Sequence, residues 1–299
     1  MKAGIGDQGS GIRVCAAVLL LAVLVVAAPA QASFDAGEAG GLAFAQDKQT
    51  PRLSNGRIES HTTTNIARDL PALAGTLSEP TWIGYAQPMI EGNHNMCDYW
   101  NDGRMVMQST DPVRLEPADF FFVMFRVEDK QITRIRIYSS NCPLDAGGKA
   151  VHWFENVSVA SSVSYVKSFI TPSATRRLND SAVTVLALTE GDQPLNELLT
   201  LARDGSTSAV KGNALFWLAQ RAGQKAVGSI TAAIENDPDT EVKKKAVFAL
   251  SQLPKDEGVP LLIQQARTNK NPVVRKQAMF WLGQTKDPRA LKFFEEILK

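Results

Sequence analysis

The sequence predicts a mainly α-helical protein in which an α-solenoid of stacked helix pairs follows a small β-rich domain. Two observations lead to this prediction. A pattern of apolar residues recurs every 32 residues through the C-terminal half of the chain. Residues 57–157 instead contain short runs rich in β-forming residues, separated by proline and glycine. With 299 residues, the chain is long enough for two such domains.

The first 32 residues have the pattern of a signal peptide. Lys2 and Arg13 precede an apolar run from Val14 to Ala28, and Ala30-Gln31-Ala32 offers the small residues of a cleavage site. The run has 15 residues, whereas a membrane-spanning helix needs ~20, so an anchor is the weaker alternative. Cys15 lies inside the segment to be removed, which argues against lipidation. We expect a periplasmic or secreted protein that meets the membrane only during export.

The charge balance excludes a broad polyanion-binding surface. The chain has 32 basic and 31 acidic side chains, and residues 1–32 hold two of the former and one of the latter, so 30 of each remain. A net charge near zero gives nucleic acid no wide basic face, and we expect no nucleic-acid partner. A local basic cluster is still expected at Lys243, Lys244, Lys245, Arg275 and Lys276.

The N-terminal part begins with a segment of low complexity. Residues 33–56 are rich in Gly, Ala, Gln and Asp and predict a flexible linker. Arg57–Thr64 is compatible with an edge strand, although His61 within it also fits a loop. Asn65 is placed to cap a single helical turn, Ile66–Leu70, which Pro71 would end.

A hairpin is the clearest element of the β-rich domain, residues 57–157. Phe120–Phe125 is apolar on both faces, as expected of a central strand, and Glu128-Asp129-Lys130 supplies a polar turn. In the returning strand, Gln131–Tyr138, arginine and isoleucine alternate with the period of two that gives one buried and one exposed face. The glycines of residues 145–149 predict a tight turn with positive φ.

Two cysteines remain after export, Cys97 and Cys142, and an even pair in an oxidising compartment predicts a disulfide. The alternative is a metal site, because the spacings of His94 to Cys97 and of Cys142 to Asp145 suit zinc. That site would make the β-rich domain a metal-assisted hydrolase. No Gly-x-Ser-x-Gly or phosphate-binding loop is present, so the sequence favours a protein without catalytic activity and without a cofactor.

The 32-residue period defines the C-terminal domain, residues 158–299. The heptapeptides ALFWLAQ, AVFALSQ and AMFWLGQ begin at residues 214, 246 and 278, and a degenerate copy begins one period earlier. Units of this length that each form one helical hairpin must stack, because a single hairpin cannot bury its own apolar stripe. The expected repeats span about 159–191, 192–223, 224–255 and 256–287, with a terminal helix at 288–299.

These repeats resemble HEAT repeats, an armadillo-like helical architecture, in the Val-Lys or Val-Arg step followed by Ala and Leu, with Asp-Pro or Asn-Pro turns at residues 237–238 and 271–272. The whole chain also resembles exported bacterial HEAT-repeat proteins of uncharacterised function in residues 82–85, 142–148 and 275–282. The resemblance implies architecture and export. Some HEAT-like solenoids bind damaged DNA or act as bilin lyases, but export and the neutral charge argue against both roles here.

One face of the second helices is the candidate binding surface. Trp217 and Trp281 fall on the buried arc and are expected in the core, and the opposite arc carries three rows that recur every 32 residues. Aligned on a concave face, such rows form a groove for a protein or peptide partner, although packing of each Phe between repeats is an equally open interpretation. The rows consist of Phe216, Phe248 and Phe280; of Gln220, Gln252 and Gln284; and of Lys244 and Lys276. The sequence therefore predicts an interaction scaffold in the cell envelope, and leaves its partner and its oligomeric state open.

Overall fold

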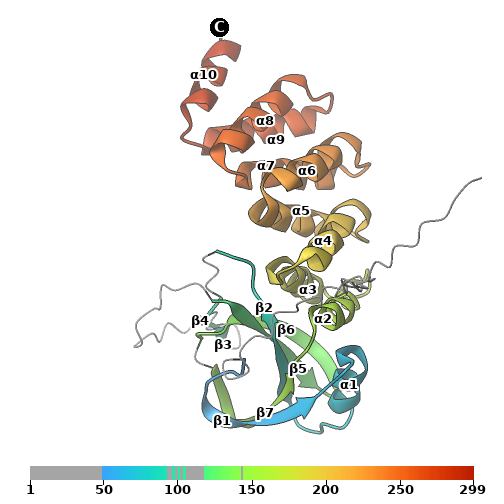
Figure 1. Ribbon diagram of the computed structural model, residues 1–299. Helices are drawn as coiled ribbons and strands as arrows, with labels where there is room; N and C mark the ends of the chain where they lie inside the picture. Colours follow the sequence, from blue (N-terminus) through green and yellow to red (C-terminus); the bar gives the residue numbers. More distant parts are fainter. Residues whose placement is uncertain (1–48, 93–95, 98–99, 102–103, 106–117, 143) are drawn as a thin grey trace, which may run out of the picture. The chain divides into compact units, whose positions relative to one another are not determined.

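The computed structural model describes residues 49–92, 96–97, 100–101, 104–105, 118–142 and 144–299 (Figure 1). The expected signal peptide, most of the expected linker and His94 lie outside these residues. The described residues form a small mixed sheet followed by paired helices, which confirms the predicted fold class. In the described part of the chain, every helix is too short or too polar to span a membrane.

The main sheet has five strands in the order β1-β7-β2-β5-β6. Strand β7 runs parallel to both of its neighbours, β1 and β2, while β5 is antiparallel to β2 and to β6. A two-stranded ribbon, β3 and β4, lies apart from it. The strands are β1 (Leu53–Thr62), β2 (Thr81–Pro88), β3 (Trp100–Asn101), β4 (Arg104–Met105), β5 (Phe120–Glu128), β6 (Gln131–Ser139) and β7 (Leu144–Glu155).

The expected hairpin is present as β5 and β6. Asp129 and Lys130 both have positive φ, so that a two-residue turn joins the strands. Ile135 and Ile137 are buried while the alternating arginines are more exposed, as the period of two predicts. Strand β5 is central, and its side chains alternate between two apolar clusters on opposite faces of the sheet.

The sheet extends beyond its expected limits at β1 and β7. Strand β1 begins at Leu53, inside the segment expected as linker. Residues 145–149 do contain a tight turn, with positive φ at Gly147 and Gly148 and with the Gly147 amide donating to Asp145 Oδ1. The turn does not end the sheet, because the register of β1 on β7 jumps from Asn55–Asp145 to Arg57–Ala150 and continues to Thr62–Glu155. The glycines therefore form a bulge within a strand.

Helix α1 (Ile66–Ala74) continues through Pro71, so the prediction that this proline ends the helix is wrong. The reason is the spacing of Ile66, Leu70 and Ala74, which all face the sheet and are buried. Burial of this stripe compensates for the hydrogen bond that proline removes. Asn65 precedes the helix but makes no side-chain cap, and the Ile66 amide instead donates to Ser161 Oγ of α2.

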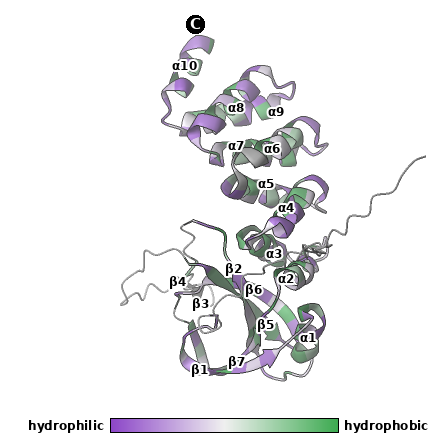
Figure 2. Ribbon diagram, in the orientation of Figure 1, coloured by the Kyte–Doolittle hydropathy of each residue, from purple (hydrophilic) through white to green (hydrophobic). Residues whose placement is uncertain are grey.

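The sheet has an apolar cluster on each face, and its strands carry both hydrophobic and hydrophilic residues (Figure 2). One face joins the helices in a continuous core, and the other holds Phe122, Met124, Val151 and Trp153. Gly84 makes the second cluster possible. A Cβ atom there would lie 2.4 Å from Met124 Sδ and 2.9 Å from the Trp153 ring.

Nine of the described helices form the C-terminal array, which consists of four pairs and a final helix (Figure 1). Each second helix is preceded by an N-cap residue whose side chain accepts a backbone N–H; these residues are Thr175, Thr207, Asp239 and Asn271. The pairs are α2 (Val159–Lys167) with α3 (Arg176–Leu188), α4 (Asp192–Asp204) with α5 (Ser208–Ala222), α6 (Gln224–Asn236) with α7 (Thr240–Gln252), and α8 (Lys255–Thr268) with α9 (Pro272–Gln284), followed by α10 (Pro288–Ile297).

The sheet packs directly on the first helix pair. The end of β2 pairs with the residues after α3, since Ile90 N donates to Leu188 O and Glu190 N donates to Pro88 O, both at 3.0 Å. The buried Tyr85 hydroxyl lies 3.0 Å from Ser162 Oγ of α2. The sheet therefore covers the open side of the first repeat.

Candidate functional site

The buried stripe of each second helix lies where the helical period places it. Three positions per helix, separated by one turn, are buried in each of α5, α7 and α9. Arg221, which shares this arc, is partly buried and donates to the carbonyls of Leu186, Ala187 and Gly191 at the end of α3. The buried positions in α5, α7 and α9 are Val210, Ala214 and Leu218; Val242, Ala246 and Leu250; and Val274, Ala278 and Leu282.

The Phe row and Trp281 form a continuous series of ring contacts, which we call the aromatic ladder: Phe216, Phe248, Trp281 and Phe280 in order of contact. Phe216 and Phe248 are parallel, with ring centroids 5.9 Å apart and an interplanar angle of 3°. The Phe248 ring lies 4.8 Å from Trp281, which in turn meets Phe280 edge-on at 5.0 Å. Trp217 packs edge-on against Phe216 at 5.3 Å.

The phenylalanine rings of the ladder differ in their exposure. Phe216 and Phe248 are partly buried, and only Phe280 is exposed, at 52%. Successive second helices pack against one another, so that side chains at equivalent positions touch across the repeats. The two interpretations left open by the sequence thus apply to different members of one row: Phe248 packs between repeats, and Phe280 faces solvent.

Among the described residues, the side chains of the Gln row likewise contact one another in the middle of the array and are free of such contacts at its C-terminal end. Gln220 Nε2 donates to Gln252 Oε1 at 3.4 Å, and Gln252 Nε2 donates to Ser251 Oγ at 3.1 Å. Gln284 is exposed, and no described residue hydrogen-bonds its side chain. At the C-terminal end of the array, an amide is therefore available to a partner.

Most of the expected basic cluster has an internal role. Lys243 Nζ donates to the carbonyls of Ile234 and Glu235 at the end of α6, and Arg275 donates to those of Asn269 and Lys270 after α8. A cation at this repeat position neutralises the exposed carbonyls of the preceding first helix. Lys243 and Arg275 therefore bind the backbone of their own chain.

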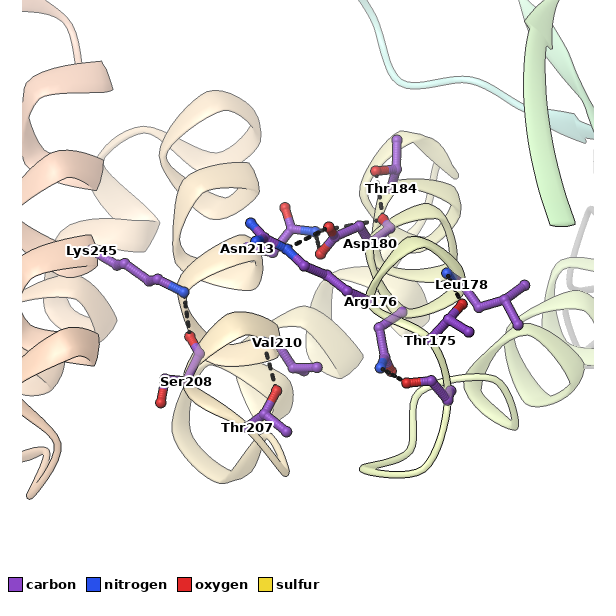
Figure 3. Close-up of polar contacts among 12 residues, drawn as sticks. Thr175, Arg176, Leu178, Asp180, Thr184, Thr207, Ser208, Val210, Asn213 and Lys245 are labelled. Atoms are coloured by element: carbon purple, nitrogen blue, oxygen red, sulfur yellow. Dashed lines mark hydrogen bonds and ion pairs between the residues drawn. The ribbon is translucent and has the colours of Figure 1, made fainter. Parts of the chain in front are cut away.

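Lys245 belongs to a polar network that joins successive repeats (Figure 3). Its ammonium group donates to Ser208 O at 3.0 Å, and its stem passes over Gly212, where a Cβ atom would lie 2.1 Å from Lys245 Cδ. In the next repeat interface, Asn213 Nδ2 donates to Asp180 Oδ1 at 3.3 Å. Burial lowers the pKa of Lys245 from its ordinary value.

Of the two lysines in the Lys row, Lys276 is the one that remains available to bind a partner. Lys244 forms an ion pair with Glu241 one turn away, at 3.0 Å. Lys276 is exposed and has no ion-pair or hydrogen-bond partner among the described residues. Together with Phe280 and Gln284, one turn apart on the same face of α9, it forms what we call the C-terminal triplet.

The cysteines of the sheet domain form the expected disulfide, Cys97–Cys142. Both thiols are thereby withdrawn from the alternative metal site. Asp145 is held in its turn, where it accepts the amide of Gly147. Within the described ranges, no group of three or more His, Cys, Asp or Glu side chains is arranged to hold a metal ion.

A histidine pair in the sheet was not foreseen. His61 lies in β1, and its Nε2 is 3.1 Å from Nδ1 of the buried His152 in β7, which is also 3.4 Å from Glu59 Oε2. Burial lowers the pKa of His152, while Glu59 opposes this effect. A cavity of about 400 Å³ adjoins His152 and is also lined by residues 76–81. The sequence contains no local signal for the pair, because its members are 91 residues apart and meet only through the pairing of β1 with β7.

The stacked helix pairs and the ladder that runs across them define a repeat protein of the α-solenoid class. Residues 195–279 and 228–299 match the family model of HEAT repeats, so this part of the chain consists of HEAT repeats. The sequence pattern predicted this family. A search of the curated proteins found no match.

Two solved structures are similar in fold over part of the chain. One is the complex of CpcE and CpcF of phycocyanin lyase from Nostoc sp. PCC7120, with 18% identity and a TM-score of 0.35 over 47% of this chain and 90% of that chain. The other is human deoxyhypusine hydroxylase in complex with glycerol, with 18% identity and a TM-score of 0.32 over 45% of this chain and 43% of that chain. At these values, neither likeness bears on function.

Proposed function

We propose that this protein is a scaffold without catalytic activity that binds a segment of a partner protein along the second helices. The observation that carries the proposal is the C-terminal triplet of Lys276, Phe280 and Gln284, which places an unpaired cation, an exposed ring and a free amide on one face of α9. Aromatic anchors with a polar rim are typical of protein-binding surfaces.

The triplet also indicates the chemistry of the partner segment. An apolar or aromatic side chain would lie against Phe280, extending the stack of the ladder by one member. An acidic side chain near Lys276 would supply the missing ion pair, and a backbone amide or carbonyl would bond Gln284. The partner therefore presents an acidic residue and an apolar residue about one helical turn or two strand residues apart.

The experiment uses a photo-crosslinking amino acid at position 280 and, as a control, at position 273. Val273 lies on the same helix and is 41% exposed, but it is off the ladder. Crosslinking in cell-envelope extract should give a discrete partner from position 280 and not from position 273. Equal yields from both positions would contradict binding on the ladder face.

Affinity measurements with the captured partner then separate the roles of the triplet. Phe280→Ala should weaken binding by about 2 kcal/mol or more, as loss of an aromatic anchor does. Lys276→Ala should chiefly slow association, and added salt should reproduce that effect. Lys286→Ala is the matched charge control, since Lys286 is exposed and lies beyond the end of α9. Unchanged affinity in folded Phe280→Ala would move the partner site away from the ladder.

Export to the periplasm or beyond is part of the same proposal. The apolar run from Val14 to Ala28 supports it, and so does the disulfide, since such bonds persist mainly in oxidising compartments. Fractionation of cells with N-terminal sequencing of the recovered protein tests it. A protein found in the cytoplasm with Met1 or Lys2 at its N-terminus would contradict export.

A further inference from the structure

The exposed large apolar side chains of the described residues are concentrated in the last part of the array. Apart from Phe280 and Val273 on α9, they belong to α10 and the residue that follows it. Leu291 is 63% exposed and Leu298 is 84% exposed. Phe294, between them, is partly buried. These three residues have the spacing of one helical stripe, which we call the α10 stripe.

The repeat shows what kind of element covers such a stripe. Thirty-two residues earlier, the equivalent positions on α8 are Val259, Leu262 and Ala266, and all three are buried. There, α9 packs on α8 as its second helix. On α10, no helix among the described residues takes that place. The α10 stripe therefore has the form of a surface that accepts one helix.

The opposite side of α10 is already occupied. Ala290 and Phe293 are buried against the preceding repeat. The Arg267 guanidinium lies 5.1 Å from the centre of the Phe293 ring and also pairs with Glu296. Arg289 is held by Asp287 and by the carbonyl of Lys255. These contacts fix α10 on the array and leave its stripe outward.

The charges beside the stripe are ordered along the helix. Lys292 lies toward its N-terminal end and Glu295 toward its C-terminal end, and neither has an ion-pair partner among the described residues. An antiparallel helix with the same sequence would place its Glu295 beside Lys292 and its Lys292 beside Glu295. The stripe would match itself in the same arrangement, Leu291 facing Leu298 and Phe294 facing Phe294.

We propose that α10 is a self-association surface, on which the α10 helix of a second copy of this chain packs antiparallel about a two-fold axis. Such an interface is isologous, so both copies contribute the same residues. It covers one helix face only, below the size of standard stable interfaces, and association is therefore weak and dependent on concentration. The α10 stripe is separate from the C-terminal triplet, so this inference does not depend on the proposed function.

Sedimentation velocity of the purified protein over a hundredfold range of concentration tests the proposal. The expected result is a shift from monomer to dimer, which Leu298→Asp or Leu291→Asp should move to at least tenfold higher concentration. Val273→Asp is the matched control and should leave the shift unchanged. Circular dichroism checks that each variant is folded. A monomer at every concentration, or a dimer that both stripe variants leave intact, would overturn the proposal.

Charge reversal distinguishes a second copy from any other helix. Lys292→Glu alone and Glu295→Lys alone should each weaken the dimer, because each places like charges opposite one another. The double variant should restore it, and so should a mixture of the two single variants, in which both cross-pairs are again of opposite sign. Failure of both the double variant and the mixture to recover association would refute the antiparallel arrangement.

Discussion

Replacement of Phe248 by alanine measures how far the aromatic ladder stabilises the array. The ring stacks on Phe216 at 5.9 Å and on Trp281 at 4.8 Å, and the side chain is partly buried. Phe→Ala changes in full cores cost ~3–5 kcal/mol, so partial burial should leave about 2 kcal/mol. Loss of two ring pairs adds ~0.5–1.5 kcal/mol each, which gives roughly 3–5 kcal/mol in total.

The losses of unfolding free energy in Leu250→Ala and Phe280→Ala provide the comparison for Phe248→Ala. Leu250 is buried, and its replacement should cost ~2–5 kcal/mol. An exposed Phe248 would cost much less than Leu250, whereas the contacts with Phe216 and Trp281 make the two costs comparable. Phe280 ends the ladder and is exposed, so its replacement should cost about 1 kcal/mol or less.

Urea titration followed by circular dichroism gives the free energy of unfolding of each variant. Coupling between Phe216→Ala and Phe248→Ala, measured in a double-mutant cycle, should be about 1 kcal/mol, since the two rings touch. A cost below ~0.5 kcal/mol for Phe248→Ala, within the range of ordinary surface changes, would refute the view that the ladder joins the repeats.

Three further predictions concern the sheet domain. Gly84→Ala should lower the free energy of unfolding by ~1–3 kcal/mol in a urea titration, because the added Cβ would meet Met124 and Trp153. The control is Gly75→Ala, whose Cβ has no contact closer than 3.5 Å, and an equal or smaller loss for Gly84→Ala would contradict this packing. Thiol labelling of denatured, non-reduced protein should find neither Cys97 nor Cys142 free, and two labelled thiols would disprove the bond. Reduction of this disulfide, which closes a separation of 45 residues, should lower stability by ~4 kcal/mol. Stability should fall on acidification below pH ~6.5, because the pKa of His152 is lowered in the folded protein and the unfolded chain therefore binds the proton first. His152→Gln should remove this part of the pH dependence, and stability that instead rises toward acid would contradict the burial of a neutral ring.

The sequence was sufficient for the array because its information there is local and repeated. The 32-residue period, the caps at Thr207, Asp239 and Asn271 and the apolar stripe each concern contacts within one helix or between adjacent helices. The β5–β6 hairpin is local in the same sense, since its two strands are joined by two residues.

The sheet was less predictable because its order depends on distant pairings. Strand β7 lies between β1 and β2, and no pattern near residues 144–155 specifies those neighbours. The His61–His152 pair depends on that insertion, so the sequence could not indicate it. The sequence left the exposure of the Phe row open for a related reason. A helical period gives the direction of each side chain, but not the distance to the next helix, and that distance decides whether Phe248 is stacked or free.

The changes along each row support the proposed binding site at the last helix pair. At the Phe position, the first repeat has Thr184, whose hydroxyl bonds the backbone of its own helix, and at the Gln position it has Leu188, which is buried where β2 pairs with the end of α3. The first repeat therefore lacks both the Phe row and the Gln row, and it packs against the sheet instead. In the middle repeats, Phe248 stacks on Phe216, and Gln252 accepts a hydrogen bond from Gln220. Among the described second helices, α9 alone combines a ring, an amide and a cation that has no described ion-pair partner. The proposed partner would therefore gain most from the last pair of helices.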